Sequence, residues 1–98
     1  MRTVHGWRKA RGQLERWRKH LTTVSVVLKT PRVIDINPVN FITGEPVEQP
    51  GKARKKFSGQ LIHFTADDAI LRRPSGALLV VDTYEMESLT AAGTRVIP

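Results

Sequence analysis

The chain has 98 residues, a length that suits a single domain spanning residues 1–98. Its 16 Lys and Arg outnumber nine Asp and Glu, which gives a formal net charge of +7, and it contains no cysteine. A disulfide framework and a thiolate metal site are therefore excluded. The longest unbroken apolar run, Ala77 to Val81, is far shorter than the roughly 20 residues of a membrane-spanning helix. We expect a cytoplasmic protein that does not enter a membrane.

The positive charge is concentrated in two places. Residues 1–20 hold seven Lys and Arg against the single acidic residue Glu15, and a second cluster lies within 52–56. Two basic patches on one domain are typical of a protein that binds a polyanion, most often a nucleic acid. The alternatives for the first patch are a solvated helix that only confers solubility, an organelle transit peptide and a membrane-surface helix.

Residues 5–21 show helical periodicity. Their apolar residues recur at spacings of three and four, which places them on one face of a helix. These residues are Trp7, Ala10, Leu14, Trp17 and Leu21. Two glycines in the first half weaken the helix, so its first turns are expected to fray. We expect Leu14, Trp17 and Leu21 to anchor the helix on the rest of the domain.

The two tryptophans have two interpretations. Each is suited either to stacking on a nucleic-acid base or to packing against the domain or a neighbouring subunit. Packing is favoured for Trp17, which lies in the middle of the predicted helix. For Trp7, near the frayed end, the two interpretations stay open.

A strand and an unusual segment follow the helix. Residues 22–30 are rich in β-branched side chains and alternate in polarity, which predicts a strand with one buried face that ends at Pro31. Residues 31–51 contain four prolines and fit neither a regular helix nor a central strand. Ile34 and Phe41 are among several apolar residues in this insertion. We expect the insertion to pack on the domain or on a neighbour.

Three short apolar runs come next, at 56–64, 69–73 and 77–81, and two polar turns separate them. They predict an antiparallel meander. Gly59 stands early in the first run, where a strand can bend without a side-chain clash. A strongly bent meander of this kind is typical of a small β-barrel.

The order of these elements resembles the Sm-like family, which includes Sm, LSm and Hfq proteins. Gly59 to Phe64 is similar to the family's first motif, in which a hydrophobic strand follows a glycine and ends at an aromatic residue, and Met86 to Leu89 stands where the family has its fifth strand. The strands also resemble the C-terminal barrel of the ribosome-maturation factor RimP. The resemblance implies a mainly β fold: a small five-stranded, strongly bent antiparallel barrel, preceded by one basic helix and interrupted by a long insertion between strands 1 and 2.

The resemblance also implies RNA binding, but the family's uracil pocket is altered here. Thr65 follows Phe64 where the family usually has aspartate, and the pocket positions fall on Asp67 and Asp68, which repel phosphate. We therefore expect single-stranded RNA, in preference to duplex, to use basic residues and two aromatic rings. The predicted contacts are Trp7, Arg8, Lys9, Arg11, Lys52, Arg54, Lys55, Lys56, Arg72, Arg73 and Tyr84.

No residue pattern indicates catalysis or a cofactor. His5, His20 and His63 lie far apart without metal-ligand spacing, and the Asp67-Asp68 pair is typical of a turn. We expect a non-enzymatic protein without metal or cofactor. The resemblance implies a hexameric or heptameric ring in which the fourth strand of one subunit pairs with the fifth strand of the next. The alternative is a structural or assembly protein, a RimP-like ribosome-associated factor or a phage component, that uses the barrel to hold a protein partner.

Overall fold

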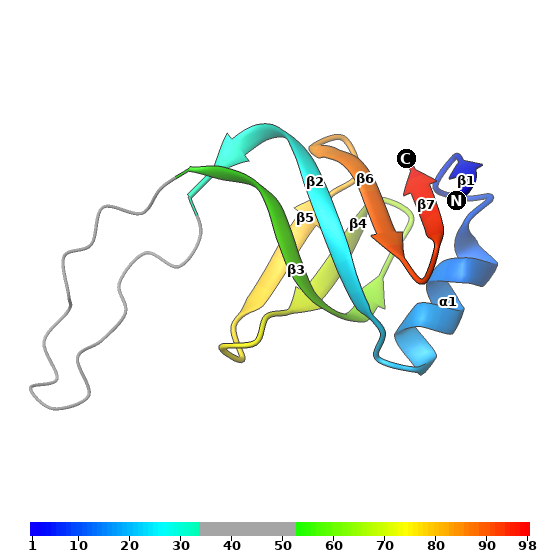
Figure 1. Ribbon diagram of the computed structural model, residues 1–98, viewed down its shortest axis with the longest axis horizontal. Coiled ribbons are helices and arrows are strands. Elements are labelled where there is room, and N and C mark those ends of the chain that lie inside the picture. Colours follow the sequence, from blue (N-terminus) through cyan, green and yellow to red (C-terminus); the bar gives the residue numbers. More distant parts are fainter. Residues whose placement is uncertain (34–52) are drawn as a thin grey trace, which may run out of the picture.

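The computed structural model describes residues 1–33 and 53–98 (Figure 1), so most of the predicted insertion lies outside the described residues. These two segments contain one helix and a predominance of strands, which confirms the mainly β class. The elements are β1 (Arg2–His5), α1 (Arg11–Lys19), β2 (Thr23–Arg32), β3 (Arg54–Phe64), β4 (Asp68–Arg72), β5 (Leu78–Asp82), β6 (Met86–Ala91) and β7 (Thr94–Ile97).

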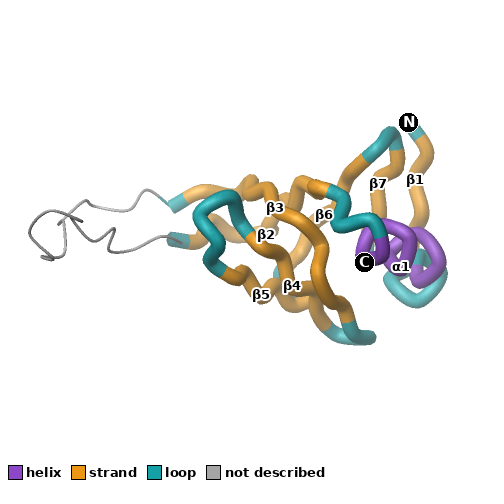
Figure 2. Tube along the Cα trace, turned by 90° about the horizontal axis from the view of Figure 1, so that it is seen from below, coloured by secondary structure: helices purple, strands orange, loops and turns teal. Residues whose placement is uncertain are grey.

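All described strands belong to one sheet in the order β1-β7-β6-β2-β3-β4-β5. Figures 1 and 2 show the sheet curling over, with β4 and β5 behind β2 and β3, and with α1 beside β7 and β1 at one end. The predicted five-stranded antiparallel barrel is wrong in three respects: the sheet has seven strands, it is not closed, and β1 pairs with β7 in parallel. The two additional strands come from residues 94–97, which pair with β6, and from residues 2–5, which pair with β7 at the far edge of the sheet.

The predicted helix over 5–21 is also too long. Gly6 has a φ of +99°, a backbone conformation that glycine adopts at little cost, and it ends β1 in a tight turn. The helix then begins only at Arg11, after Ala10, so Trp7 and Ala10 belong to the entry turn. Leu14 and Trp17 are buried as predicted. Leu21 is 47% exposed at a φ of +48° just after the helix, so the prediction that it anchors the helix is wrong.

The core lies on the concave side of the sheet. The predicted alternation in β2 is confirmed, because Val24, Val26 and Leu28 are buried. Cross-strand pairing places Val26 between Leu89 of β6 and Phe57 of β3, so that one apolar row crosses the sheet. Packing of Leu14 and Trp17 against this core fixes α1 to the sheet.

Gly59 of β3 lies very close to the backbone of β4. A Cβ atom built at Gly59 would lie 2.7 Å from the carbonyl oxygen of Arg72, closer than real Cβ atoms come. The expectation of a bend near this glycine fits a register shift between Leu61 and His63. The prediction that Pro31 ends its strand is wrong, because β2 continues to Arg32, which pairs with Arg54 beyond a second register shift.

The free edges of the sheet are β5 and β1. β6, which corresponds to the predicted fifth strand, pairs with β2 on one side and with β7 on the other. The strand contact expected to close a ring is therefore not open at β6, because β7 already occupies that edge. No helix in the described part of the chain is long and apolar enough to cross a membrane.

Candidate nucleic-acid interface

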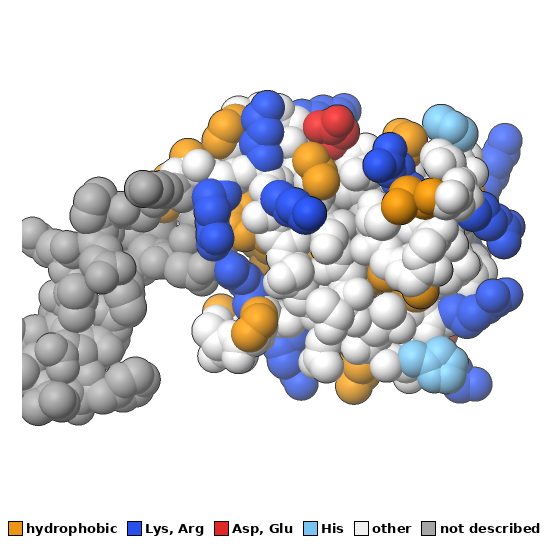
Figure 3. Space-filling model, in the orientation of Figure 1, with side chains coloured by type: hydrophobic (Ala, Val, Ile, Leu, Met, Phe, Trp, Pro, Cys, Tyr) orange, Lys and Arg blue, Asp and Glu red, His pale blue; other side chains and the backbone are white. Residues whose placement is uncertain are grey.

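The described residues carry a strong excess of positive charge. They include 15 Lys and Arg against six Asp and Glu, a difference of +9 (15 minus 6). Figure 3 shows Lys and Arg side chains spread across the face that carries β2, β3 and β6, with little acidic surface between them. The predicted contact residues divide into a group on the approach to α1 and a group at the other end of the sheet.

The second group is enlarged by two cations of β2. We call it the hairpin cluster, and it contains Lys29, Arg32, Arg54, Lys55, Lys56, Arg72 and Arg73. Pairing of β2 with β3 brings Arg32 opposite Arg54 and Val27 opposite Lys56. Lys52, which was predicted to contribute, lies outside the described residues.

Phe57 organises part of this cluster. The guanidinium carbon of Arg54 lies 5.2 Å from the centre of the Phe57 ring, and that of Arg73 lies 5.3 Å from it. Phe57 itself is only 3% exposed. One buried aromatic ring therefore holds two arginines, from β3 and from the segment after β4, within reach of the same ligand through cation–π contacts.

A groove beside Tyr84 adjoins the cluster. It measures about 580 Å³ and its walls include Lys29, Arg32 and Glu85. Arg32 donates a hydrogen bond of 3.0 Å to the carbonyl of Val80, and its guanidinium lies 3.5 Å from the Glu85 carboxylate.

Tyr84 is 72% exposed. Its phenol is hydrogen-bonded to Asp82, which, together with the nearby charge of Glu85, raises the pKa of Tyr84 above its usual value. The tyrosine is therefore a neutral, exposed ring that lies beside the carboxylates of Asp82 and Glu85 and shares its groove with Lys29 and Arg32.

A second groove lies on the outer face of the sheet. Residues Thr23, Gln60 and Arg72 are cross-strand neighbours in β2, β3 and β4, and Ser58 stands two residues before Gln60 on the same face. The turn from Arg73 to Gly76 forms the remaining wall, and the groove measures about 310 Å³. No acidic residue lines it.

The group before α1 is arranged differently from the prediction. Trp7 is only 7% exposed, and its indole Nε1 donates a hydrogen bond of 2.7 Å to the carbonyl of Thr65. This burial corresponds to the packing interpretation and leaves no open ring face for a base. Arg8 and Arg11 line a groove of about 490 Å³ with Phe64, while Lys9 is exposed nearby.

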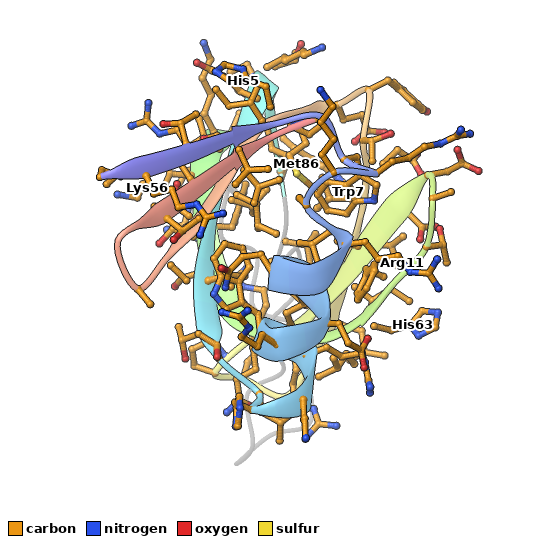
Figure 4. The ribbon with its side chains drawn as sticks, turned by 90° about the vertical axis from the view of Figure 1, so that its right-hand side faces the viewer. His5, Trp7, Arg11, Lys56, His63 and Met86 are labelled. Carbon is orange, nitrogen blue, oxygen red and sulfur yellow. The ribbon has the colours of Figure 1, made fainter. Side chains whose placement is uncertain are left out.

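Figure 4 looks onto this end of the molecule. Trp7 is turned toward the sheet, and Arg11 and His63 lie together on one side, away from Lys56. The helix itself also carries one ion pair, between Arg18 and Glu15, which lowers the pKa of that glutamate through a hydrogen bond and charge attraction.

Four of the six acidic residues in 1–33 and 53–98 lie in or beside two adjoining turns: Asp67, Asp68, Asp82 and Glu85. Asp67 and Asp68 follow β3, and the carbonyl of Asp67 accepts a hydrogen bond from the Thr83 amide in the turn after β5. Asp68 also pairs with Asp82 across β4 and β5. These carboxylates are not among the residues that line the 310 Å³ groove.

No group of three or more His, Asp or Glu within 1–33 and 53–98 is placed to hold a metal ion. His5, His20 and His63 are each exposed and stand on different elements.

Sequence reasoning overlooked several residues of the interface. Lys29 was assigned only to the predicted strand and Arg32 only to the predicted insertion. Thr23, Ser58 and Gln60 were not considered because uncharged residues carry no charge signal. The pairing register of β2 and β3 is the information that unites them. Comparisons with protein-family models, with curated proteins and with solved structures find no match to this chain.

Proposed function

We propose that the protein binds single-stranded RNA without catalysing a reaction on it, and that the hairpin cluster provides most of the contacts. The observation that carries this proposal is the convergence of Arg54 of β3 and Arg73, just after β4, over the Phe57 ring. Strand pairing adds Arg32 of β2, which lies opposite Arg54 and forms an ion pair with Glu85. Lys and Arg that neutralise phosphates supply most of the affinity for a nucleic-acid backbone.

Single-stranded RNA is favoured over a duplex by the position of Tyr84. An exposed aromatic ring beside cations is the usual arrangement for stacking an unpaired base while its phosphates are neutralised. The ring lies in one groove with Lys29 and Arg32. In a duplex the bases are stacked on one another, so Tyr84 would have no base to receive.

Two triple variants with the same change in charge test the proposal. Lys29→Ala, Lys55→Ala and Lys56→Ala together remove three exposed cations of the hairpin cluster whose side chains form no ion pair with any residue of 1–33 or 53–98. Lys9→Ala, Arg16→Ala and Lys19→Ala remove three exposed cations near or on α1. We expect the first variant to bind a fluorescent single-stranded RNA at least about tenfold more weakly. For this variant, the plot of log binding constant against log salt concentration should become less steep by about 0.7 for each lost phosphate contact.

The second variant should keep most of the affinity. An equal loss in both variants would mean that net charge alone attracts RNA, and an unchanged hairpin variant would remove this cluster from the site. Wild-type protein that fails to bind RNA at low salt would contradict the function itself.

An assembly role is the second candidate, favoured by the free edge at β5. Arg73 N–H donates a hydrogen bond to the Ala77 carbonyl, and ladder bonds alternate, so the backbone groups of Leu78 and Val80 face away from β4. The Val80 carbonyl already accepts a hydrogen bond from Arg32, so another strand pairs at this edge only by displacing that side chain. The side chains of Leu78 and Val80 are 60% and 46% exposed. An exposed apolar edge strand tends to pair with another strand.

We propose a second copy of this chain as the occupant of that edge. If two β5 strands pair antiparallel about Leu79, Leu78 of each copy stands opposite Val80 of the other, so the apolar positions match themselves. A self-complementary contact of this kind gives a two-fold dimer. Such a dimer replaces the hexamer or heptamer expected from the sequence, because the edge of β6 is occupied by β7.

The likeness to Sm-like proteins remains part of this proposal for β2 to β6 alone. In its support, these five strands are neighbours in the sheet, with β2 between β3 and β6, and the sheet is strongly curled. β7 and β1 then form an addition at one edge.

A further inference from the structure

The groove of about 310 Å³ on the outer face of the sheet has the chemistry of an oxyanion site. Its side chains include the Arg72 guanidinium, the hydroxyls of Thr23 and Ser58 and the amide of Gln60. All four can donate hydrogen bonds to a phosphate oxygen. With no carboxylate among its lining residues, the groove favours an anion over a cation.

The positions of these donors are fixed by strand pairing. Thr23 pairs with Gln60, and Gln60 pairs with Arg72, so three donors form a straight row across β2, β3 and β4. Side chains of directly paired residues on one face lie about 5 Å apart. A phosphate placed over Gln60 is therefore within reach of a neighbour on each side.

Arg72 is well suited to be the principal anion ligand. Its side chain is exposed, and it forms no ion pair with any residue of 1–33 or 53–98. The close approach of β4 to Gly59 holds the Arg72 backbone against β3. A planar guanidinium can donate two parallel hydrogen bonds to a phosphate, which an ammonium group cannot reproduce.

Arg73 and the turn that follows complete the groove. Arg73 lines the groove, and its guanidinium carbon lies 5.3 Å from the centre of the Phe57 ring. Gly76 has a φ of +88° and its amide bonds to the Arg73 carbonyl, which closes the turn over one side of the groove.

We propose that this groove binds one phosphate group of the RNA backbone, with Arg72 as the bidentate ligand and Thr23, Ser58 and Gln60 as hydrogen-bond donors. The proposal rests on the proposed function, because the RNA is the source of the phosphate. The groove adds to the hairpin cluster a fixed subsite for a single phosphate. By holding one phosphate in a fixed position, the groove sets the register of the RNA strand without contacting its bases.

The first experiment uses inorganic phosphate on the ¹⁵N-labelled full chain, with chloride at matched ionic strength as the reference. We expect the amide signals of Ser58, Gln60 and Gly76 to shift on addition of phosphate while that of Gly93, in the turn between β6 and β7, stays in place. The same signals should shift further and at lower concentration with a short single-stranded RNA. Signals that fail to move with either ligand would overturn the proposal.

The second experiment measures RNA affinity in variants that preserve charge. Arg72→Lys should weaken binding about tenfold with an unchanged salt slope, since the charge remains and the paired hydrogen bonds are lost. Arg95→Lys, an exposed arginine on β7, is its matched control and should bind within about twofold of wild type. Thr23→Val combined with Ser58→Ala should weaken binding about threefold. Thr90→Val, on β6, should leave binding unchanged.

The results separate this proposal from the proposed function. Tight, salt-dependent RNA binding that Arg72→Lys leaves intact would overturn the phosphate subsite and leave the function standing. If inorganic phosphate shifts the amide signals of Ser58 and Gln60 but the protein binds no RNA, the proposal that RNA is the source of the phosphate is wrong. Thermal melting of each variant excludes unfolding as the cause of a loss.

Discussion

The turn between β6 and β7 contains two consecutive residues with a positive φ, and the first of them is not glycine. Ala92 and Gly93 form the two-residue turn between β6 and β7, with φ values of +47° and +77°. A two-residue hairpin with both φ values positive is a type I′ turn, for which Asn-Gly is the favoured sequence. Alanine at the first position carries strain that asparagine largely avoids.

We therefore expect Ala92→Asn to stabilise the protein by about 1 kcal/mol. For a domain of this size, that gain raises the melting temperature by roughly 4–8 °C. Calorimetry or circular dichroism will measure it. Ala92→Val is the matched control and should lower the melting temperature, because a β-branched residue tolerates a positive φ poorly. A melting temperature that is lower for the asparagine variant than for wild type would refute the type I′ turn.

Replacement of glycine by alanine should have opposite effects on stability at Gly59 and at Gly12. Gly59→Ala should destabilise the protein by about 1–3 kcal/mol, because the new Cβ meets the Arg72 backbone and strands β3 and β4 must move apart. Gly12→Ala should stabilise it by up to about 1 kcal/mol, since the position is helical and has no atom near the added Cβ. Urea denaturation of both variants gives the comparison. Equal effects would contradict the close approach at Gly59.

At the scale of elements, patterns within one short window were the reliable signal. β2 was predicted because buried Val24, Val26 and Leu28 alternate with more exposed neighbours. β3 to β5 were predicted as short apolar runs between polar turns, and β6 only from the resemblance to Sm-like strands. β1 was missed because four residues are too few for such a pattern. Its place in the sheet depends on parallel pairing with β7, at the opposite end of the sequence. The start of the helix was predicted too early for a similar reason. The positive φ of Gly6, which ends β1 ahead of the helix, is a backbone feature that the periodicity of the sequence does not reveal.

The free edge of β5 makes a prediction about association. Leu78→Lys combined with Val80→Lys places two charges on the exposed edge, where lysines oppose strand pairing. We expect wild type to form a dimer at high concentration, seen by light scattering or native mass spectrometry, and this variant to stay monomeric with unaltered phosphate shifts. Lys55→Ala is a control, because it alters charge away from β5. A hexamer or heptamer of wild type would contradict the dimer.

At the scale of the whole molecule, the candidate site was only partly predictable. The excess of Lys and Arg is visible in composition, and the cluster at Arg54 to Lys56 lies in one short run. Lys29, Arg32 and Arg72 join that run in one cluster because of the register of three strands, and no local pattern in the sequence specifies this register. Trp7 lies apart from Lys56 of this cluster (Figure 4), a separation that no local pattern specifies either. Charge was thus predictable, and its arrangement was not.

The parallel pair of β1 and β7 has a consequence for the order of folding. Arg2 pairs with Thr94, which lies 92 positions further along the chain (94 minus 2). Contacts between such distant residues form slowly, because the chain loses the entropy of closing a large loop before the contacts stabilise it. During synthesis, residues 2–5 must wait until residues 94–97 have emerged, while β2 to β6 can already collapse around their shared core. Hydrogen exchange should therefore find the amides of β1 among the first to open in the native protein and among the last to gain protection during refolding.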